Sequence, residues 1–344
     1  MLQDEATILL AELDGSKKET MMKMRFWALL VASGLVIFSA GAQDYPTRQI
    51  DLAVPFAAGG PTDTLARGLA QVMSAQLKQT VVVENVPGAG GTIAANRVVK
   101  AKPDGYSLLI THIGLATAPS LYRKLPFNPL KDFEYVGQVA DVPMTLIAKT
   151  SLPPDNLTQL IAYIKKNNAK LNLGHAGLGA ASQLCGLLFT SRIQTEITTI
   201  PYNGTAPAMT ALIGGEIDLM CDQTTNTTNP IRSGMVKVYG TTTSKRIAVL
   251  PMVPTLAEQG LKDFEVAVWH GVYAPKGTPP AVINRLVTAL QASVQDKQFK
   301  KRLSDLGAEV VTPDKATPAS LEKKLNAEVE KWAAIIKKAG VYAD

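Results

Sequence analysis

The order of strands, turns and helices is the feature that most constrains the fold of this chain. An apolar run over 49–56 is typical of a buried strand, and an amphipathic segment over 64–77 is typical of a helix. The same succession recurs along the chain, and it predicts parallel sheets with crossover helices. Further strands are predicted over 81–84, 107–111, 172–175, 198–201, 217–221 and 236–241, and further helices over 92–100, 182–192 and 206–213.

Two long extended segments predict that the chain forms two α/β lobes with a cleft between them. The segments 134–149 and 265–275 are rich in apolar residues and have no helical period, so each is expected to cross between lobes. The later elements are too few for a third domain and are expected to return to the first lobe. The predicted limits are 43–143 plus 268–344 for lobe 1 and 144–267 for lobe 2, and the later elements are helices over 279–295, 298–306 and 318–339 and a strand over 309–311.

The N-terminal region predicts export. Lys23 and Arg25 precede an apolar run over 26–38, and the small residues that follow end in Ala42. This arrangement is typical of a secretory signal peptide, and the run is shorter than the ~20 apolar residues of a membrane helix. We expect cleavage after Ala42, with an uncleaved anchor as the alternative. Residues 1–21 carry acidic side chains where basic ones are expected, which favours a start at Met21, Met22 or Met24.

Export and charge argue against several classes of function. ATP and NAD stay in the cytoplasm, so chemistry driven by them is not expected of an exported chain. The 35 basic and 29 acidic residues give a net charge of +6. The basic residues nowhere form the dense stripe expected of a nucleic-acid-binding face. We therefore expect no nucleic acid partner and no cofactor.

Four turns rich in small residues lie where predicted strands lead into helices, over 57–63, 87–92, 176–182 and 202–207. Such turns line the ligand crevice of an open parallel sheet, and the first N–H groups of each helix favour negative charge. We therefore expect a carboxylate to be held by backbone N–H groups, hydroxyls, amides and water; ordinary tight turns are the alternative. Neither Lys nor Arg occurs across 55–64, 85–92, 111–119, 174–182, 201–207 and 221–229.

Several chemistry-bearing residues have simpler interpretations than catalysis. His112, His175 and His270 follow strands or a crossing segment, but no pair has the spacing of a helical metal motif. We expect no metal site, and instead a structural role or a hydrogen bond to a ligand. Asp63 is expected to accept hydrogen bonds at a helix start or to pair with Arg67, although a general base is the alternative.

The cysteines and one tryptophan are assigned to packing. Cys185 and Cys221 are expected to be buried free thiols, although an oxidising compartment permits a disulfide. Trp269 is expected to pack between the lobes, with the cleft floor as the alternative. The turn over 177–182 lacks the last glycine of the dinucleotide-binding pattern, so that function is not expected.

A set of spaced motifs gives the chain a resemblance to a known family from about Tyr45 to Gly340. The motifs are PFAAGGPTD over 55–63, NVPGAGG over 85–91, KPDGY over 102–106, LKDF over 130–133, PYNG over 201–204, GGEID over 214–218, VPTLAE over 253–258 and APKGTP over 274–279. On these motifs the chain resembles the Bug family, the extracytoplasmic receptors of tripartite tricarboxylate transporters.

The resemblance implies an α/β periplasmic-binding-protein fold of the type II-like class, with a central cleft and two crossing hinge strands. It implies that turns matching 57–63 and 88–91 grip a small carboxylate in lobe 1. The turn matching 177–182 and the residues near 203–205 and 222 complete the site in lobe 2. The candidate ligand-binding residues are Phe56, Ala58, Gly59, Thr62, Asp63, Gly88, Ala89, Gly90, Gly91, His112, Gly177, Gly179, Ala180, Ala181, Ser182, Asn203, Gly204, Thr205 and Asp222.

Three departures from the family pattern bear on the ligand. Ala180 and Gln183 stand where members often have Ser and His, and Asn203 stands where they often have Lys or Arg. Each change removes a donor or a charge, so we expect an aromatic or aliphatic mono- or dicarboxylate rather than citrate. The main hypothesis is a monomeric, non-catalytic periplasmic receptor that delivers its ligand to membrane permease subunits. The alternative is an exported enzyme that uses Asp63 or a histidine as a base.

Overall fold

A mixed sheet of ten strands organises the part of the chain that the computed structural model describes, residues 45–262, 264–340 and 342–343. The strand order is β2-β1-β3-β9-β4-β7-β5-β6, and β8 and β10 pair with β4. The predicted signal peptide, its cleavage after Ala42 and the start methionines lie outside the described residues. The strands are β1 (Ile50–Val54), β2 (Val81–Asn85), β3 (Ser107–His112), β4 (Phe133–Lys149), β5 (Asn172–His175), β6 (Thr198–Pro201), β7 (Leu219–Gln223), β8 (Val236–Thr241), β9 (Ala267–Pro275) and β10 (Glu309–Val310).

Two groups of parallel strands form the two lobes of the fold. In the first lobe β1 pairs in parallel with β2 and β3, and in the second β5 pairs in parallel with β6 and β7. The inner strands β1, β3, β5 and β7 are largely buried, as is usual for parallel sheets covered by helices, whereas the edge strands β2 and β6 are partly exposed. The helices are α2 (Pro61–Leu77), α3 (Thr92–Val99), α4 (Gly114–Leu121), α5 (Leu157–Asn167), α6 (Ala181–Ile193), α7 (Thr205–Ile213), α8 (Thr224–Arg232), α9 (Pro280–Ser293), α10 (Lys297–Asp305) and α11 (Pro318–Ala339), with short 3-10 turns η1 (Ala89–Gly91) and η2 (Asn168–Lys170).

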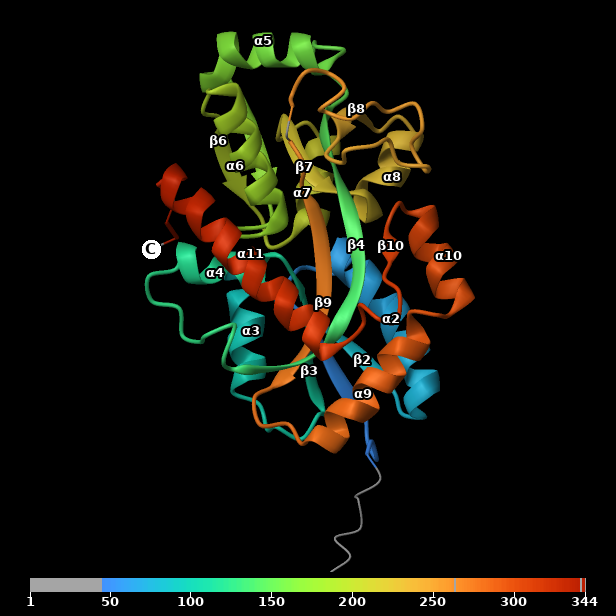
Figure 1. The fold of residues 1–344 in the computed structure, drawn as a ribbon. Helices are drawn as coiled ribbons and strands as arrows, with labels where there is room; N and C mark the ends of the chain where they lie inside the picture. Colours follow the sequence, from blue (N-terminus) through green and yellow to red (C-terminus); the bar gives the residue numbers. More distant parts are fainter. Residues whose placement is uncertain (1–44, 263, 341, 344) are drawn as a thin grey trace, which may run out of the picture. The chain divides into compact units, whose positions relative to one another are not determined.

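Strand β4 connects the lobes. Its first part, up to Pro143, pairs with β9, and its last part, from Met144, pairs with β7 and β8. Figure 1 shows β4 running from the group that contains α2, α3 and α9 to the group that contains α5–α8. The return passage lies at the start of β9. There Thr242 donates its backbone N–H to the Met144 carbonyl at 2.9 Å, and its hydroxyl donates to the Val266 carbonyl at 2.6 Å.

Local sequence signals explain where the helices begin. Pro61 at the start of α2 suits a position whose N–H has no helical partner. The Asn156 side chain accepts a hydrogen bond from the first turn of α5, and the Thr317 side chain accepts one from the first turn of α11.

Helices α4, α5 and α8 are absent from the sequence-based prediction. Tertiary packing supports α8 in particular, because its sequence TTNTTNPIR has low intrinsic helix propensity and carries a proline.

The prediction of free thiols is wrong. Cys185 of α6 and Cys221 of β7 form a disulfide, with their Cα atoms 6.0 Å apart. The two residues are distant in sequence, and only the fold brings α6 onto β7. The crosslink stands one residue before Asp222, so it fixes the strand end that carries a predicted ligand contact.

The helices of the C-terminal part pack on β4 and on helices from the N-terminal part of the chain. Helices α9 and α11 pack on β4, and α11 also packs on α4.

Trp269 lies in the hydrophobic core and is 1% exposed, which agrees with the predicted packing role. Within the described residues no helix combines the length and apolar character needed to cross a bilayer. The residue limits predicted for the two lobes remain a prediction, because β4 belongs to both.

Candidate functional site: a cleft between four turns

The turn after β1 and the turn after β6 meet across the cleft. The backbone N–H of Ala57 donates to the carbonyl of Asn203 at 2.9 Å. Gly204 lies so close that a Cβ on it would stand 2.9 Å from the Ala57 nitrogen. A side chain at position 204 would therefore push these two turns apart.

The turn after β2 meets the turn after β5 in the same way. A Cβ on Gly90 would stand 1.8 Å from the carbonyl oxygen of Leu178. Tyr122, just after α4, lies with its hydroxyl 2.8 Å from the Ala89 carbonyl and 3.2 Å from the Leu178 carbonyl. The Thr117 hydroxyl lies 3.2 Å from a third turn carbonyl, that of Gly179. The turns of the two lobes thus meet in two pairs, and the lobes are closed on each other.

Asp63 holds the first turn in shape. Its carboxylate accepts hydrogen bonds from the Gly59 backbone N–H, the Arg67 guanidinium and the Asn85 amide, each at 2.9 Å. Burial alone would raise the pKa of Asp63, but the hydrogen bonds from Arg67, Gly59 and Asn85 outweigh it and lower that pKa. The expected capping and pairing roles are therefore present. The ionised carboxylate is engaged within the turn and lines neither cavity of the cleft.

A small inner cavity of about 10 Å³ lies where the lobes meet. This is about the space of one water molecule, so a carboxylate needs the lobes to separate before it can enter. The first lobe contributes polar groups from α2 and β3, and the second contributes the start of α6 and the end of β7. The lining residues are Phe56, Pro61, Thr62, His112, Ala176, Ala180, Ala181, Ser182, Thr205, Asp222 and Gln223.

One neutral histidine, His112, lines the first-lobe wall of the inner cavity, and a second, His270, lies behind it. His112 stacks on Phe56 with ring centroids 4.8 Å apart, and its Nδ1 accepts the Gly114 backbone N–H at 3.0 Å. The proton of the neutral ring is therefore on Nε2, which makes that atom a donor. Burial lowers the pKa of His112 to about 4. Behind it His270 is fully buried, with Nε2 3.2 Å from the Thr62 hydroxyl, and burial holds its pKa well below the usual value.

The second-lobe wall of the inner cavity carries acceptors. Asp222 is 1% exposed, and one carboxylate oxygen accepts the Asn226 amide at 2.6 Å. Burial raises the pKa of Asp222 to about 7, against the opposing effect of Asn226, the Gln223 N–H and the Thr205 hydroxyl. Its other oxygen, Oδ1, and the side-chain oxygen of Gln223 have no hydrogen-bond partner within the described residues.

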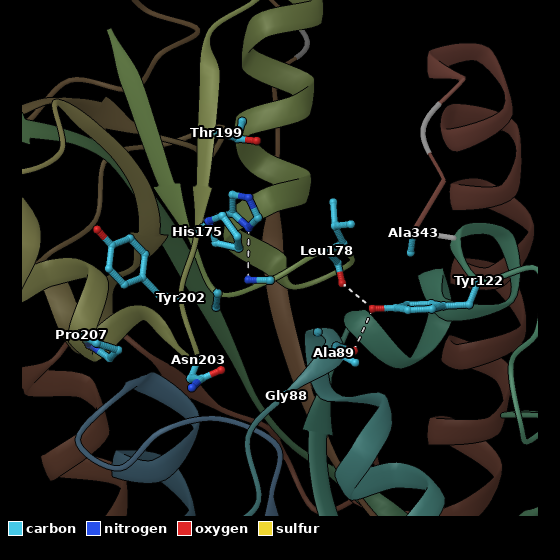
Figure 2. A pocket seen from close by; sticks show the side chains of 14 residues that line it. Gly88, Ala89, Tyr122, His175, Leu178, Thr199, Tyr202, Asn203, Pro207 and Ala343 are labelled. Atoms are coloured by element: carbon cyan, nitrogen blue, oxygen red, sulfur yellow. Dashed lines mark hydrogen bonds between the residues drawn. The ribbon is translucent and has the colours of Figure 1, made fainter.

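A larger pocket of about 750 Å³ lies on the outer side of the second pair of turns. Figure 2 shows the Tyr122 hydroxyl between the Ala89 and Leu178 carbonyls on one side, with His175 and Tyr202 on the other. His175 accepts the Gly177 backbone N–H at its Nδ1, 3.1 Å away, so it too offers Nε2–H when neutral. The lining residues are Gly88, Ala89, Gly90, Tyr122, His175, Ala176, Gly177, Leu178, Thr199, Pro201, Tyr202, Asn203, Pro207 and Ala343.

The structure divides the predicted site residues into four groups. The inner cavity and the outer pocket bring together most of them, as their linings show. Ala58, Gly59 and Asp63 belong to the first turn without lining either cavity, and Gly179 and Gly204 act at the contacts between turns. Gly91 lines a separate small cavity behind the second turn. Tyr122, Gln223 and Tyr202 were not singled out from the sequence, although Gln223 directly follows Asp222 at a strand end.

Charge is almost absent from both cavities. Neither lining includes Lys or Arg, and Asp222 is the carboxylate that faces the inner one. No cluster of three or more His, Cys, Asp or Glu side chains suited to a metal ion occurs within the described residues. The side-chain polar groups that line the two cavities are hydroxyls, imidazoles, the amides of Asn203 and Gln223, and the Asp222 carboxyl.

Comparison with known proteins agrees with this geometry. The family model described as "Tripartite tricarboxylate transporter family receptor" (TctC) matches residues 65–341. The chain belongs to this family. A UPF0065 protein from the TAR-I ttuE-ttuC' intergenic region of Agrobacterium vitis is 48% identical over 324 residues, which cover 94% of each chain.

Three solved structures share the fold. The periplasmic binding protein BugD is 52% identical, with a TM-score of 0.85 over 87% of this chain and 99% of its own. MatC from Rhodopseudomonas palustris with bound malate is 38% identical, with a TM-score of 0.83 over 85% of this chain and 100% of its own. An R. palustris protein with adipate is 34% identical, with a TM-score of 0.82 over 87% of this chain and 99% of its own. The two-lobe periplasmic-binding-protein fold expected from the sequence is therefore confirmed.

Proposed function

We propose that this TctC-family protein is a periplasmic receptor that captures a small carboxylate by closing its two lobes and delivers it to a tripartite tricarboxylate-type permease. The ligand class is an aromatic or aliphatic mono- or dicarboxylate. Malate in MatC and adipate in its R. palustris relative are aliphatic dicarboxylates, and they favour the aliphatic part of this range.

The pairing of turns across the cleft is the observation that carries the proposal. Glycine turns from both lobes meet where no cationic side chain lines the cavities. Hydrogen bonds from backbone N–H groups to a carboxylate contribute about 1.5–3 kcal/mol each. Several such bonds, supplied by both lobes at once, support tight binding only in the closed arrangement.

Closure follows from the two connections between the lobes. A ligand stabilises the closed arrangement by contacts that it makes with both lobes and cannot make when they are apart. Rotation at the Pro143–Met144 part of β4 and at the Thr242–Val266 contact would separate the turns while each sheet group stays intact. The closed surface would then be the form that the permease subunits recognise.

Calorimetric titration tests the proposal, with succinate, malate, adipate, citrate, benzoate and phthalate as ligands for the protein purified without refolding. Binding of at least one acid, with a thermal shift and the same acid recovered unchanged by mass spectrometry, supports a receptor. A modified acid among the recovered molecules would favour the enzyme alternative. Absence of binding by every acid would contradict carboxylate capture.

N-terminal sequencing of the exported protein tests the proposed location. A mature chain that begins at Gln43 in the periplasmic fraction is expected, because cleavage is predicted after Ala42. Retention of residues 26–38 in a membrane fraction would instead support the uncleaved anchor.

A further inference from the structure

The turn between β6 and α7 contains the only Asn-Gly pair in the sequence, Asn203–Gly204. Glycine is needed at position 204 because its φ is 154° and because a Cβ would stand 2.9 Å from the Ala57 nitrogen. Asparagine is a chemically labile residue, and a following glycine leaves the next backbone nitrogen unshielded by any side chain. The close approach of the two lobes therefore requires the glycine that makes Asn203 labile.

Neither reacting group of this pair is held by a neighbour. The Asn203 side chain is exposed and lines the outer pocket, and its amide makes no hydrogen bond within the described residues. The backbone N–H of Gly204, the N-cap residue of α7, makes none within that part of the chain either. Because Asn203 is exposed, the water that hydrolysis consumes can also reach it.

We propose that Asn203 is a site of spontaneous deamidation whose rate depends on whether the lobes are open or closed. The Gly204 nitrogen loses its proton and bonds to the side-chain carbonyl carbon of Asn203, and the side-chain nitrogen takes up a proton and leaves as ammonia. Water then opens the cyclic imide at one of its ring C–N bonds, which gives aspartate or isoaspartate. One water is consumed and one ammonia is released, without oxidant, reductant or enzyme.

Closure of the lobes opposes the ring-forming step because it fixes the peptide group that must turn. The Asn203 carbonyl accepts the Ala57 N–H at 2.9 Å. This carbonyl and the Gly204 nitrogen belong to one planar peptide group, so moving the nitrogen towards the Asn203 side chain also moves the carbonyl away from Ala57. Open lobes leave this group free to turn. A ligand that stabilises the closed arrangement therefore also protects Asn203.

Both products weaken the contact between the lobes. Isoaspartate adds a carbon to the backbone and displaces the carbonyl that Ala57 contacts. Aspartate adds a carboxylate to a lining without Lys or Arg, where it repels an approaching acid. The protein therefore loses affinity as it ages, and empty molecules age faster than loaded ones. The conversion itself is independent of the proposed function, and only its dependence on closure and its effect on affinity rest on that function.

Peptide mapping by mass spectrometry measures the conversion in the mature protein during incubation at mildly alkaline pH, which favours loss of the amide proton. We expect Asn203 to convert at least tenfold faster than Asn156, with isoaspartate among the products. Asn156 is an internal control because Leu157 follows it and its side chain accepts the Gln159 N–H at 3.0 Å. Equal rates at the two asparagines, or no conversion at Asn203, would overturn the inference.

Two glycine variants test the dependence on closure without any ligand. Gly90→Ala holds the lobes apart, because its Cβ would stand 1.8 Å from the Leu178 carbonyl oxygen, whereas Gly215→Ala adds a Cβ with nothing within 4 Å. We expect Asn203 to convert at least threefold faster in Gly90→Ala than in Gly215→Ala, and Asn156 to convert equally in both. Equal conversion of Asn203 in the two variants would overturn the dependence on closure.

Calorimetric titration of fresh and aged protein measures the effect on binding, with the panel of acids used for the proposed function. We expect the fraction of protein that binds tightly to fall in proportion to the conversion of Asn203. Unchanged binding by converted protein would overturn the loss of affinity. Absence of binding by fresh protein would overturn the proposed function and the loss of affinity together, while peptide mapping still decides whether Asn203 deamidates.

Discussion

The Ala57 backbone N–H and the Asn203 carbonyl form a 2.9 Å hydrogen bond that joins the two lobes directly. The residues are far apart in sequence and belong to turns after β1 and β6. A bond of this kind exists only while the lobes are closed, so it is one of the contacts that a ligand must keep together.

Gly90→Ala should block closure without unfolding the protein. Its Cβ would lie 1.8 Å from the Leu178 carbonyl oxygen, which belongs to the other lobe. We expect ligand affinity to fall at least tenfold, measured by calorimetric titration, with far-ultraviolet circular dichroism unchanged.

Gly215→Ala is the matched control for this change. Gly215 also has a positive φ, 82° against 60° for Gly90, but nothing lies within 4 Å of its added Cβ. Both variants carry the backbone strain of an alanine at positive φ, and only Gly90→Ala meets the other lobe. Similar affinities for the two variants would refute the contact between these turns.

Tyr122→Phe should weaken the closed form by a smaller amount. The hydroxyl bridges the Ala89 and Leu178 carbonyls, one on each lobe. Loss of a hydrogen bond of about 1 kcal/mol corresponds to roughly two- to tenfold weaker binding. We expect this loss as a faster dissociation rate in stopped-flow measurements. Tyr163→Phe on α5, which lines neither cavity, serves as the control and should leave the rate unchanged.

His112 should make stability depend on pH in the acid range. Burial lowers its pKa to about 4, below the ordinary value of 6.5, so the unfolded chain binds more protons between these two values. The contribution is complete above pH 6.5 and is lost as pH falls towards 4, to a limit of about 3 kcal/mol. Urea unfolding of wild type and His112→Asn at pH 7.5 and pH 5 measures it as the difference between the two proteins.

The comparison with the variant is needed because Asp222 changes the pH dependence of the unfolding free energy in the opposite direction. Its pKa is raised to about 7, so its contribution to stability falls as pH rises from 3.8 towards 7. Comparison with His112→Asn cancels this shared effect to first order. If the two proteins lose stability in parallel between pH 7.5 and pH 5, His112 is not held neutral by burial.

The Cys185–Cys221 disulfide should contribute substantially to stability. It closes a loop with a sequence separation of 36 residues, for which the chain-entropy relation gives about 4 kcal/mol. We expect Cys185→Ser with Cys221→Ser to lower the free energy of unfolding by about 2–4 kcal/mol in urea titrations. Thiol titration of the denatured wild type, without reductant, should find no reactive thiol from either residue.

Much of the fold follows from local patterns. The limits of β8 and α11 were predicted as they stand, because each has a clear period and α11 starts at a capping threonine. Helix α8 was missed because threonine and asparagine favour other conformations locally. Packing of its buried threonines against β4 and β7 offsets this low helix propensity. The disulfide was missed for a related reason, since nothing local brings Cys185 to Cys221.

The sequence predicts the turns of the candidate site, but it does not predict the side-chain interactions that line the cavities between them. Glycines mark the turns because only they tolerate such close approach, as Gly90 does at Leu178. Tyr122 has no such mark in the sequence, since its role arises from the distance between two carbonyls on different lobes. The same holds for the unpaired oxygen of Asp222, which becomes informative only once its neighbours are known.

The lack of Lys and Arg in the cleft lining has a consequence for selectivity in the crowded envelope of a cell. Peptide dipoles act over a short range and in a fixed direction. Sulfate, phosphate and nucleotides outside the opening are therefore only weakly attracted to the cleft. Salt ions therefore find no cationic side chain in the cavity linings whose charge they could screen. In the receptor proposed above, recognition would depend on the shape of the ligand and on its pattern of hydrogen-bond donors and acceptors, and we expect its affinity to change little with ionic strength.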